Sequence, residues 1–196
     1  MPSQPGEAEI IELPVPRAPT PRKARARRVI AIGGGKGGIG KSLLSANLGI
    51  ALSKRGAKVV LADLDLGGAN LHTCLGVPQP KVSLSDFVER RVTSLDQVLV
   101  PTPHTNLSLL SGAMDGLDAA NPRHAQKTKL LRNLRSLDVD YVLLDLGAGT
   151  TFNVLDFFLV ADTGVVVMLP EPTSIENAYR FIKAAFFRRL QALAPQ

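Results

Sequence analysis

The 196-residue sequence contains one cysteine, Cys74, and no tryptophan. A single cysteine excludes a disulfide framework and any Cys-x-x-Cys metal site within these residues, which favours a reducing, cytoplasmic setting. No run of about 18 consecutive apolar residues occurs, and the N-terminal residues lack the apolar segment of a secretory signal. The sequence therefore predicts neither a membrane-spanning helix nor export, and we expect Cys74 to be packed as a small apolar residue.

Charge is unevenly distributed along the chain. Residues 1–28 carry six arginines or lysines and three glutamates, a net charge of +3, which is half of the +6 of the whole sequence. The same stretch contains six prolines, which remove backbone donors and disfavour helix and strand. We expect residues 1–27 to be a disordered, Pro/Arg-rich basic tail. Its candidate ligands are nucleic acid, an acidic membrane surface or an acidic partner, and the alternative is a solubilising tail without a specific partner.

A phosphate-binding loop is the clearest motif in the sequence. Residues 35–42 fit the pattern G-x-x-x-x-G-K-[ST], which needs a strand before it and a helix after it. The β-branched apolar residues 28–32 predict a buried strand, and residues 43–54 predict a helix. That context favours a loop whose N–H groups surround phosphate oxygens over a glycine-rich surface turn. We expect Lys41 to reach the β- and γ-phosphates of a nucleotide, and the Ser42 hydroxyl to bind Mg²⁺.

The loop also contains a second lysine, Lys36, whose alternative interpretation is a solvated loop side chain. The residues that we expect to contact the nucleotide in this segment are Gly35, Lys36, Gly37, Gly38, Ile39, Gly40, Lys41, Ser42 and Leu43. In the helix that follows, the expected inner face consists of Leu44, Leu48, Ala51 and Leu52.

Acidic residues follow two further apolar runs. Residues 57–63 and 140–145 predict buried strands, and the first leads into Asp63 and Asp65 while the second ends at Asp145. Because ligands bind beyond the carboxyl ends of the strands in an open parallel sheet, these carboxylates are expected beside the phosphate loop. Asp63 has two open interpretations, a contribution to a magnesium site and a cap of its own loop.

The remaining pattern alternates strands with helices. Strands are predicted over 106–111 and 164–169, short helical pieces over 83–91 and 95–99, and longer helices over 122–137 and 174–193. The inward residues are expected to be Leu130, Leu131, Leu134 and Leu137 in the first long helix, and Ile175, Ala178, Ile182, Ala185 and Phe186 in the second. We expect the second to be a crossover helix packed on the sheet; the alternative is a helix lying on a membrane. The fold class is therefore α/β, with a mainly parallel sheet flanked by helices in three layers.

Four segments resemble the ParA/MinD group of P-loop ATPases, which have a deviant Walker motif with a second lysine. They are residues 36–42, 63–70, 145–149 and 170–179. The second and fourth most resemble the flagellar number regulators FlhG and FleN, followed by MinD. The resemblance implies an ATPase domain over 28–193, corresponding to the N-terminal two-thirds of the family domain, so we expect the fold to be incomplete on its C-terminal side.

The resemblance also implies a mechanism. ATP and Mg²⁺ would be the cofactors, and ATP would drive a homodimer in which Lys36 reaches the nucleotide of the partner. Asp65 would orient the attacking water and lie beside the metal, Asp145 would hold Mg²⁺ through its water shell, and Asn70 would support the phosphate side of the switch. An unidentified protein partner would stimulate slow hydrolysis, and the dimer would position a flagellum, a division site or another cargo from the cytoplasm, peripherally at a membrane or nucleoid.

Two other function classes compete with this interpretation. One is a non-hydrolysing module that binds nucleotide or nucleic acid and uses the basic tail. The other is an iron–sulfur relative of the same fold, which needs paired cysteines between subunits and is disfavoured because Cys74 stands alone.

Overall fold

The computed structural model of the protein describes residues 28–65, 70–112 and 124–193. The expected basic tail, residues 1–27, lies outside these ranges, as do residues 66–69 of the segment after the second strand. No helix in the described ranges is long and apolar enough to cross a membrane.

A six-stranded sheet forms the middle layer, with the strand order β3-β4-β2-β5-β1-β6. Every neighbouring pair is parallel except β3 and β4. The strands are β1 (Arg28–Gly34), β2 (Val59–Leu64), β3 (Leu99–Pro101), β4 (Leu107–Leu110), β5 (Tyr141–Ala148) and β6 (Thr163–Val166). Strands β2 and β5 are buried almost throughout because helices cover both faces of the sheet, as expected for a parallel arrangement.

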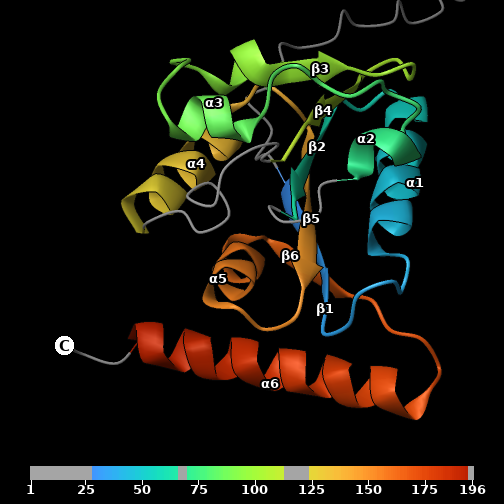
Figure 1. Ribbon diagram of the computed structural model, residues 1–196, viewed down its shortest axis with the longest axis vertical. Coiled ribbons are helices and arrows are strands. Elements are labelled where there is room, and N and C mark those ends of the chain that lie inside the picture. The colour runs from blue at the N-terminus through green and yellow to red at the C-terminus, as the bar shows by residue number, and fades with distance from the viewer. Residues whose placement is uncertain (1–27, 66–69, 113–123, 194–196) are drawn as a thin grey trace, which may run out of the picture.

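Helices cover the two faces in separate groups (Figure 1). One group consists of α1 (Lys41–Lys54) and α2 (Leu71–Cys74). The other consists of α3 (Leu84–Val88), the 3₁₀ helix η1 (Leu95–Val98), α4 (His124–Ser136), α5 (Phe152–Val160) and α6 (Pro172–Leu193). Each group packs into its own apolar core, with Ala46 and Leu71 in the first and Phe87, Leu134, Phe157 and Phe181 in the second. The predicted three-layer α/β fold with a mainly parallel sheet is confirmed.

The register of the sheet brings the predicted site segments to one edge. Asp63 on β2 is paired with Asp145 on β5, and Asp145 is paired with Ile32 on β1, two residues before that strand ends at Gly34. The phosphate loop therefore follows β1 at the same edge of the sheet to which the C-terminal parts of β2 and β5 bring the two acids. The topology of the sheet alone thus brings the phosphate loop, Asp63 and Asp145 together.

Several sequence predictions are corrected by the structure. Leu99, predicted as the last residue of a short helix, instead begins the edge strand β3, and neither α2 nor α5 was predicted. Residues 152–160 are apolar nearly throughout, so they lack the periodicity from which a helix can be recognised. Cys74 is exposed rather than packed, because the single turn of α2 buries Leu71 instead.

The inner faces of two helices also differ from those predicted. Helix α1 packs through small residues, with Ser45, Ala46 and Gly49 buried while Leu44 is 42% exposed. Its close approach to the sheet explains this, since a Cβ on Gly49 would lie 3.3 Å from Leu107. Helix α6 buries Ser174, Ala178, Phe181 and Ala185, and it exposes Ile175, Ile182 and Phe186. In α4 the predicted burial of Leu130, Leu134 and Leu137 around its C-terminal half is confirmed.

Candidate functional site

The phosphate loop has the backbone conformation that its glycines were expected to allow. Gly38 and Gly40 have φ angles of 72° and 89°, a region that favours glycine, and α1 begins immediately afterwards at Lys41. Lys41 is 8% exposed, and its Nζ donates to the carbonyl oxygen of Lys36 at 3.3 Å. The ammonium group therefore lies across the inside of the loop, at the N-terminus of a helix, where anions are stabilised.

Glycines at the start of the loop serve packing rather than backbone freedom. A Cβ on Gly35 would lie 2.1 Å from the carbonyl oxygen of Asn177, and one on Gly33 would lie 2.9 Å from the ring of Phe181. Both neighbours belong to α6, which passes directly behind the loop. The loop is thus supported by a helix more than 130 residues away in the sequence.

Asp145 lies at the bottom of the loop and is 1% exposed. The hydroxyl of Ser45 on α1 donates to its Oδ1 at 2.9 Å. Burial raises the pKa of Asp145 above its usual value, while hydrogen bonds from Ser42 and Ser45 and the charge of Lys41 act in the opposite direction. Asp145 is therefore hydrogen-bonded to Ser42 and lies within the electrostatic influence of Lys41, the two loop residues that were predicted from the motif.

Asp63 holds the backbone of the segment after β2. It is 2% exposed, and its two carboxylate oxygens accept from the N–H groups of Asp65 at 3.1 Å and of Leu71 at 3.0 Å. Burial raises the pKa of Asp63 to about 7, and the nearby charges of Asp145 and Asp65 add to that rise against the two backbone donors. The sequence left two interpretations of Asp63 open. Its hydrogen bonds with the N–H groups of Asp65 and Leu71 support the one in which it caps its own loop.

Asp65, Asn70 and Leu43 were also predicted at the site, and they lie at the carboxyl-end edge of the sheet, nearer to solvent than Asp145. The Asp65 side chain lies against Gly147 of β5, where a Cβ would be 3.1 Å from its Oδ1. Asn70 is exposed and its side chain makes no capping bond to α2, and Leu43 in the first turn of α1 is 62% exposed. Asp65 is thus brought beside Asp145, while Asn70 and Leu43 have side chains open to solvent.

The second lysine of the loop has a partner within the same chain. Nζ of Lys36 lies 2.7 Å from Oε1 of Glu171, and both side chains are about two-fifths exposed, at 42% and 43%. The hydrogen bond and charge of Lys36 lower the pKa of Glu171 below its usual value. Glu171 immediately precedes α6, so this ion pair joins the phosphate loop to the start of that helix.

The donor set suits a magnesium ion that is bound mainly through water and phosphate. No group of three or more His, Cys, Asp or Glu side chains that could hold a metal ion occurs among the described residues. Mg²⁺ commonly takes only one or two protein ligands alongside waters and substrate phosphates. The Ser42 hydroxyl and the Asp145 carboxylate, which are hydrogen-bonded to one another, are residues of that kind.

Comparison with protein families agrees with this geometry. The ParA family model, described as "NUBPL iron-transfer P-loop NTPase", matches residues 25–193. This chain is a member of the ParA/MinD family of P-loop NTPases. The description names iron transfer, but the sequence contains a single cysteine, Cys74, and therefore no cysteine pair.

The relatives of this chain include an antiactivator and septum site-determining proteins. The antiactivator FleN of Pseudomonas aeruginosa is 36% identical over 157 residues, covering 80% of this chain and 55% of FleN. The septum site-determining protein MinD of Helicobacter pylori is 36% identical over 156 residues, covering 79% of this chain and 57% of that protein. The structure of MinD from Pyrococcus horikoshii OT3, complexed with Mg-ADP, is similar with a TM-score of 0.72 and 29% identity, covering 83% of this chain and 66% of that one. The chain thus spans little more than half the length of these curated relatives.

Three residues of the site were not singled out from the sequence. Ser45 could be recognised only from the packing of α1 beside Asp145, and Gly147 lay in the segment 145–149 that carried the family resemblance, without a role of its own. Glu171 lay in a segment that carried the family resemblance, yet no role was assigned to it. A glutamate between two prolines, directly after a strand of the same parallel sheet, is a signal that could have placed it at this edge.

Proposed function

We propose that residues 28–193 form an ATPase domain that binds ATP with Mg²⁺ and hydrolyses it slowly. The observation that carries this proposal is a set of contacts at the loop. Lys41 donates a hydrogen bond to the carbonyl oxygen of Lys36, and the hydroxyl groups of Ser42 and Ser45 on α1 donate to Asp145. The Mg-ADP bound by the structurally similar MinD supports the choice of nucleotide and metal.

Each residue has a role that follows from its position. The N–H groups from Gly37 to Leu43 and the Lys41 ammonium group bind the phosphates, and Ser42 and Asp145 hold the metal site. Mg²⁺ would supply positive charge to the β- and γ-phosphate oxygens. Asp65, at the mouth of the site, orients a water for attack, and Asn70 lies on the same loop segment. Asp63 fixes both ends of that segment through two backbone hydrogen bonds.

Lys36 is proposed to act in a dimer. Its side chain is partly exposed at the rim of the loop, and its only ion pair in the described ranges is the one with Glu171. Breaking that pair would let the ammonium group reach a nucleotide held by a second copy, where it would stabilise charge on the transferred phosphoryl group. Dimerisation would then depend on ATP, and hydrolysis would reset the switch.

The cellular role that fits best is positioning of a structure such as a flagellum or division site. FleN and MinD, which share 36% of their residues with this chain in the matched region, support that class. We propose that the protein works in the cytoplasm, peripherally at a membrane or nucleoid, with an activating protein partner. Residues 1–27, with their excess of arginine, are candidates for the contact with a nucleic acid or an acidic membrane surface.

The proposal is tested by calorimetry of the full chain with ATP and Mg²⁺. Lys41→Ala should weaken binding by about 100-fold or more, because a buried cation on the phosphates is lost. A matched Lys54→Ala substitution, at the exposed end of α1, should leave binding unchanged. Equal affinity of wild type and Lys41→Ala would refute the phosphate-loop assignment.

Phosphate release distinguishes the enzyme from a non-hydrolysing module. Wild-type protein should release phosphate at saturating ATP and Mg²⁺, and Asp65→Ala should slow the release by about 100-fold while retaining ATP binding. Absence of release from a wild type that binds ATP would favour the module.

A further inference from the structure

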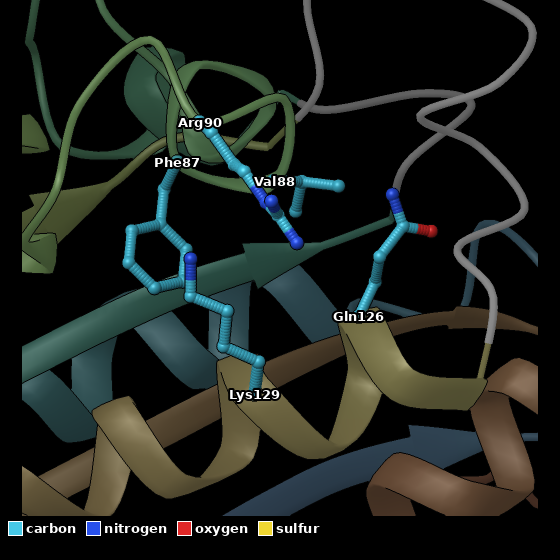
Figure 2. Close-up of a pocket in the computed structure, with 5 residues that line it drawn as sticks. All are labelled: Phe87, Val88, Arg90, Gln126 and Lys129. Atoms are coloured by element: carbon cyan, nitrogen blue, oxygen red, sulfur yellow. The ribbon is translucent and has the colours of Figure 1, made fainter.

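Helix α4 exposes a row of cations between two hollows of the surface. The first hollow lies between α3 and α4 and has a volume of about 120 Å³. Figure 2 shows Arg90 reaching into it from the turn after α3, while Lys129 extends from α4 beside the ring of Phe87. Nζ of Lys129 lies 4.5 Å from the centre of that ring, so the cation is held over an aromatic face.

The second hollow is a groove of about 640 Å³ between α4, α5 and α6. Its floor includes Leu131 and Leu159, which pack against the apolar core. Its rim carries four guanidinium groups, from Arg132, Arg135, Arg188 and Arg189. The groove therefore combines an apolar surface with a concentrated positive charge.

Two of these arginines are fixed by acids. Arg188 donates from Nε to Asp156 at 2.9 Å, and Arg135 donates from Nη2 to Asp162 at 3.0 Å. Arg132 and Arg189 form no ion pair with any residue of the described ranges, and the same holds for Arg90 and Lys129 in the first hollow. Within the described ranges, four cations around α4 therefore have no acidic partner.

This surface lies away from the phosphate loop. Helices α4 and α5 end next to the starts of β5 and β6, whereas the loop follows the end of β1, and all three strands are parallel. Arg135 and Val160, which line the second hollow at the ends of α4 and α5, are consequently on the side of the sheet opposite Asp145 and Lys41. Nothing in the ATP chemistry proposed above requires the two hollows.

We infer that α4 and its two flanking hollows bind an acidic, amphipathic segment of a protein partner. Carboxylates of such a segment would pair with the uncompensated cations, and its apolar side chains would cover Leu131 and Leu159. Arginine and aromatic side chains with this combination are typical of protein interfaces. A nucleic acid backbone would meet the charge but leave the apolar floor uncovered, and a flat bilayer would not enter a groove between three helices.

The test uses the full chain and a fluorescein-labelled helical peptide of about 16 residues, or about four turns, in which pairs of leucines alternate with pairs of glutamates. Fluorescence anisotropy at about 0.15 M salt should show binding in the micromolar range. A peptide with serine in place of every leucine should bind at least about tenfold more weakly, since only charge remains. Failure of the first peptide to bind, or equal binding of both peptides, would overturn the inference.

Two double variants with the same change in net charge locate the site. Arg132→Glu with Arg189→Glu should weaken binding of the leucine–glutamate peptide by about tenfold or more. Lys54→Glu with Arg55→Glu, exposed residues at the end of α1 on the other face of the sheet, should weaken it less than about twofold. Residues 1–27 are present in the wild type and in both double variants, so any contribution they make to peptide binding is the same in all three proteins. Equal losses in the two double variants would show that net charge alone attracts the peptide and would overturn the inference.

Competition decides between classes of partner. Excess of a short DNA duplex or of vesicles containing phosphatidylserine should leave the bound peptide in place. One result would assign the surface to DNA or to the membrane instead. In that result the competitor displaces the peptide from the wild type and itself binds the Arg132→Glu and Arg189→Glu double variant more weakly. Circular dichroism of each variant should show the wild-type melting temperature within a few degrees, because both pairs are exposed.

Discussion

Lys36 and Glu171 form an ion pair of 2.7 Å that joins the phosphate loop to the residue directly before α6. The lysine proposed to act on a neighbouring subunit is thereby engaged within its own chain. Any contact of Lys36 with a second copy must compete with Glu171. The pair is therefore a natural control point for the dimer equilibrium.

Replacing Glu171 should release the lysine. In Glu171→Gln we expect ATP-dependent dimers at about two- to fivefold lower protein concentration, a modest effect because partly exposed ion pairs are weak. Sedimentation velocity with ATP and Mg²⁺ measures the midpoint. The matched control is Glu176→Gln, which removes the exposed pair with Arg180 on α6. A midpoint that stays the same or moves to higher concentration would argue against competition by Glu171.

Removing the lysine itself separates binding from dimerisation. Lys36→Ala should bind ATP within about twofold of the wild-type affinity, since Lys41 supplies the cation inside the loop. It should remain monomeric with ATP, because no cation is left to reach the partner's nucleotide. Calorimetry and sedimentation on the same preparation test both parts. Dimers of Lys36→Ala at wild-type concentration would rule out a role for this lysine across the interface.

The position of Asp145 could be predicted from the sequence, whereas the buried face of α6 could not. Strands were recognised because an apolar run followed by an acid is a local pattern, and parallel topology then places such acids at one edge. Asp63 and Asp145 are paired in the sheet in agreement with that reasoning.

The faces of the helices depend on distance to the sheet, which no local pattern encodes. Gly49 lets α1 approach closely, so Ser45 becomes buried beside Asp145 while Leu44 is left partly exposed. Likewise α6 turns Phe181 toward Gly33, and Ile175 and Ile182 face outward as a consequence. Glu171 could not be assigned a partner for the same reason, because its contact with Lys36 depends on where α6 begins.

Two glycines of the loop should differ sharply in their tolerance of a side chain. Gly35→Ala places a Cβ 2.1 Å from the carbonyl oxygen of Asn177, so α6 or the loop must move. We expect a loss of about 2–3 kcal/mol in the free energy of unfolding and a weaker ATP affinity. Gly37→Ala is the control, since its Cβ would meet only Ala148 at 3.9 Å. Urea unfolding of both variants measures the difference, and equal stabilities would contradict the close packing of α6 on the loop.

The pH dependence of stability should reveal the buried carboxyl of Asp63. Its pKa is about 7 in the folded protein against an ordinary 3.8, because burial favours the neutral form. The folded state therefore binds a proton that the unfolded chain has released, and stability falls as the pH rises from about 4 to about 7. Between pH 5 and pH 8 the free energy of unfolding should drop by about 2–3 kcal/mol from this group.

Asp63→Asn isolates that contribution, since an amide resembles the protonated acid and does not titrate. The drop between pH 5 and pH 8 should become smaller in the variant but not vanish, because burial also raises the pKa of Asp145. Asp162→Asn serves as the control: the pKa of Asp162 is lowered, chiefly by the hydrogen bond from the N–H of Val29, so its contribution is lost only at more acidic pH. Urea unfolding of nucleotide-free protein across this range provides the measurement. If Asp63→Asn kept the full wild-type drop, the neutral, buried carboxyl at the end of β2 would be refuted.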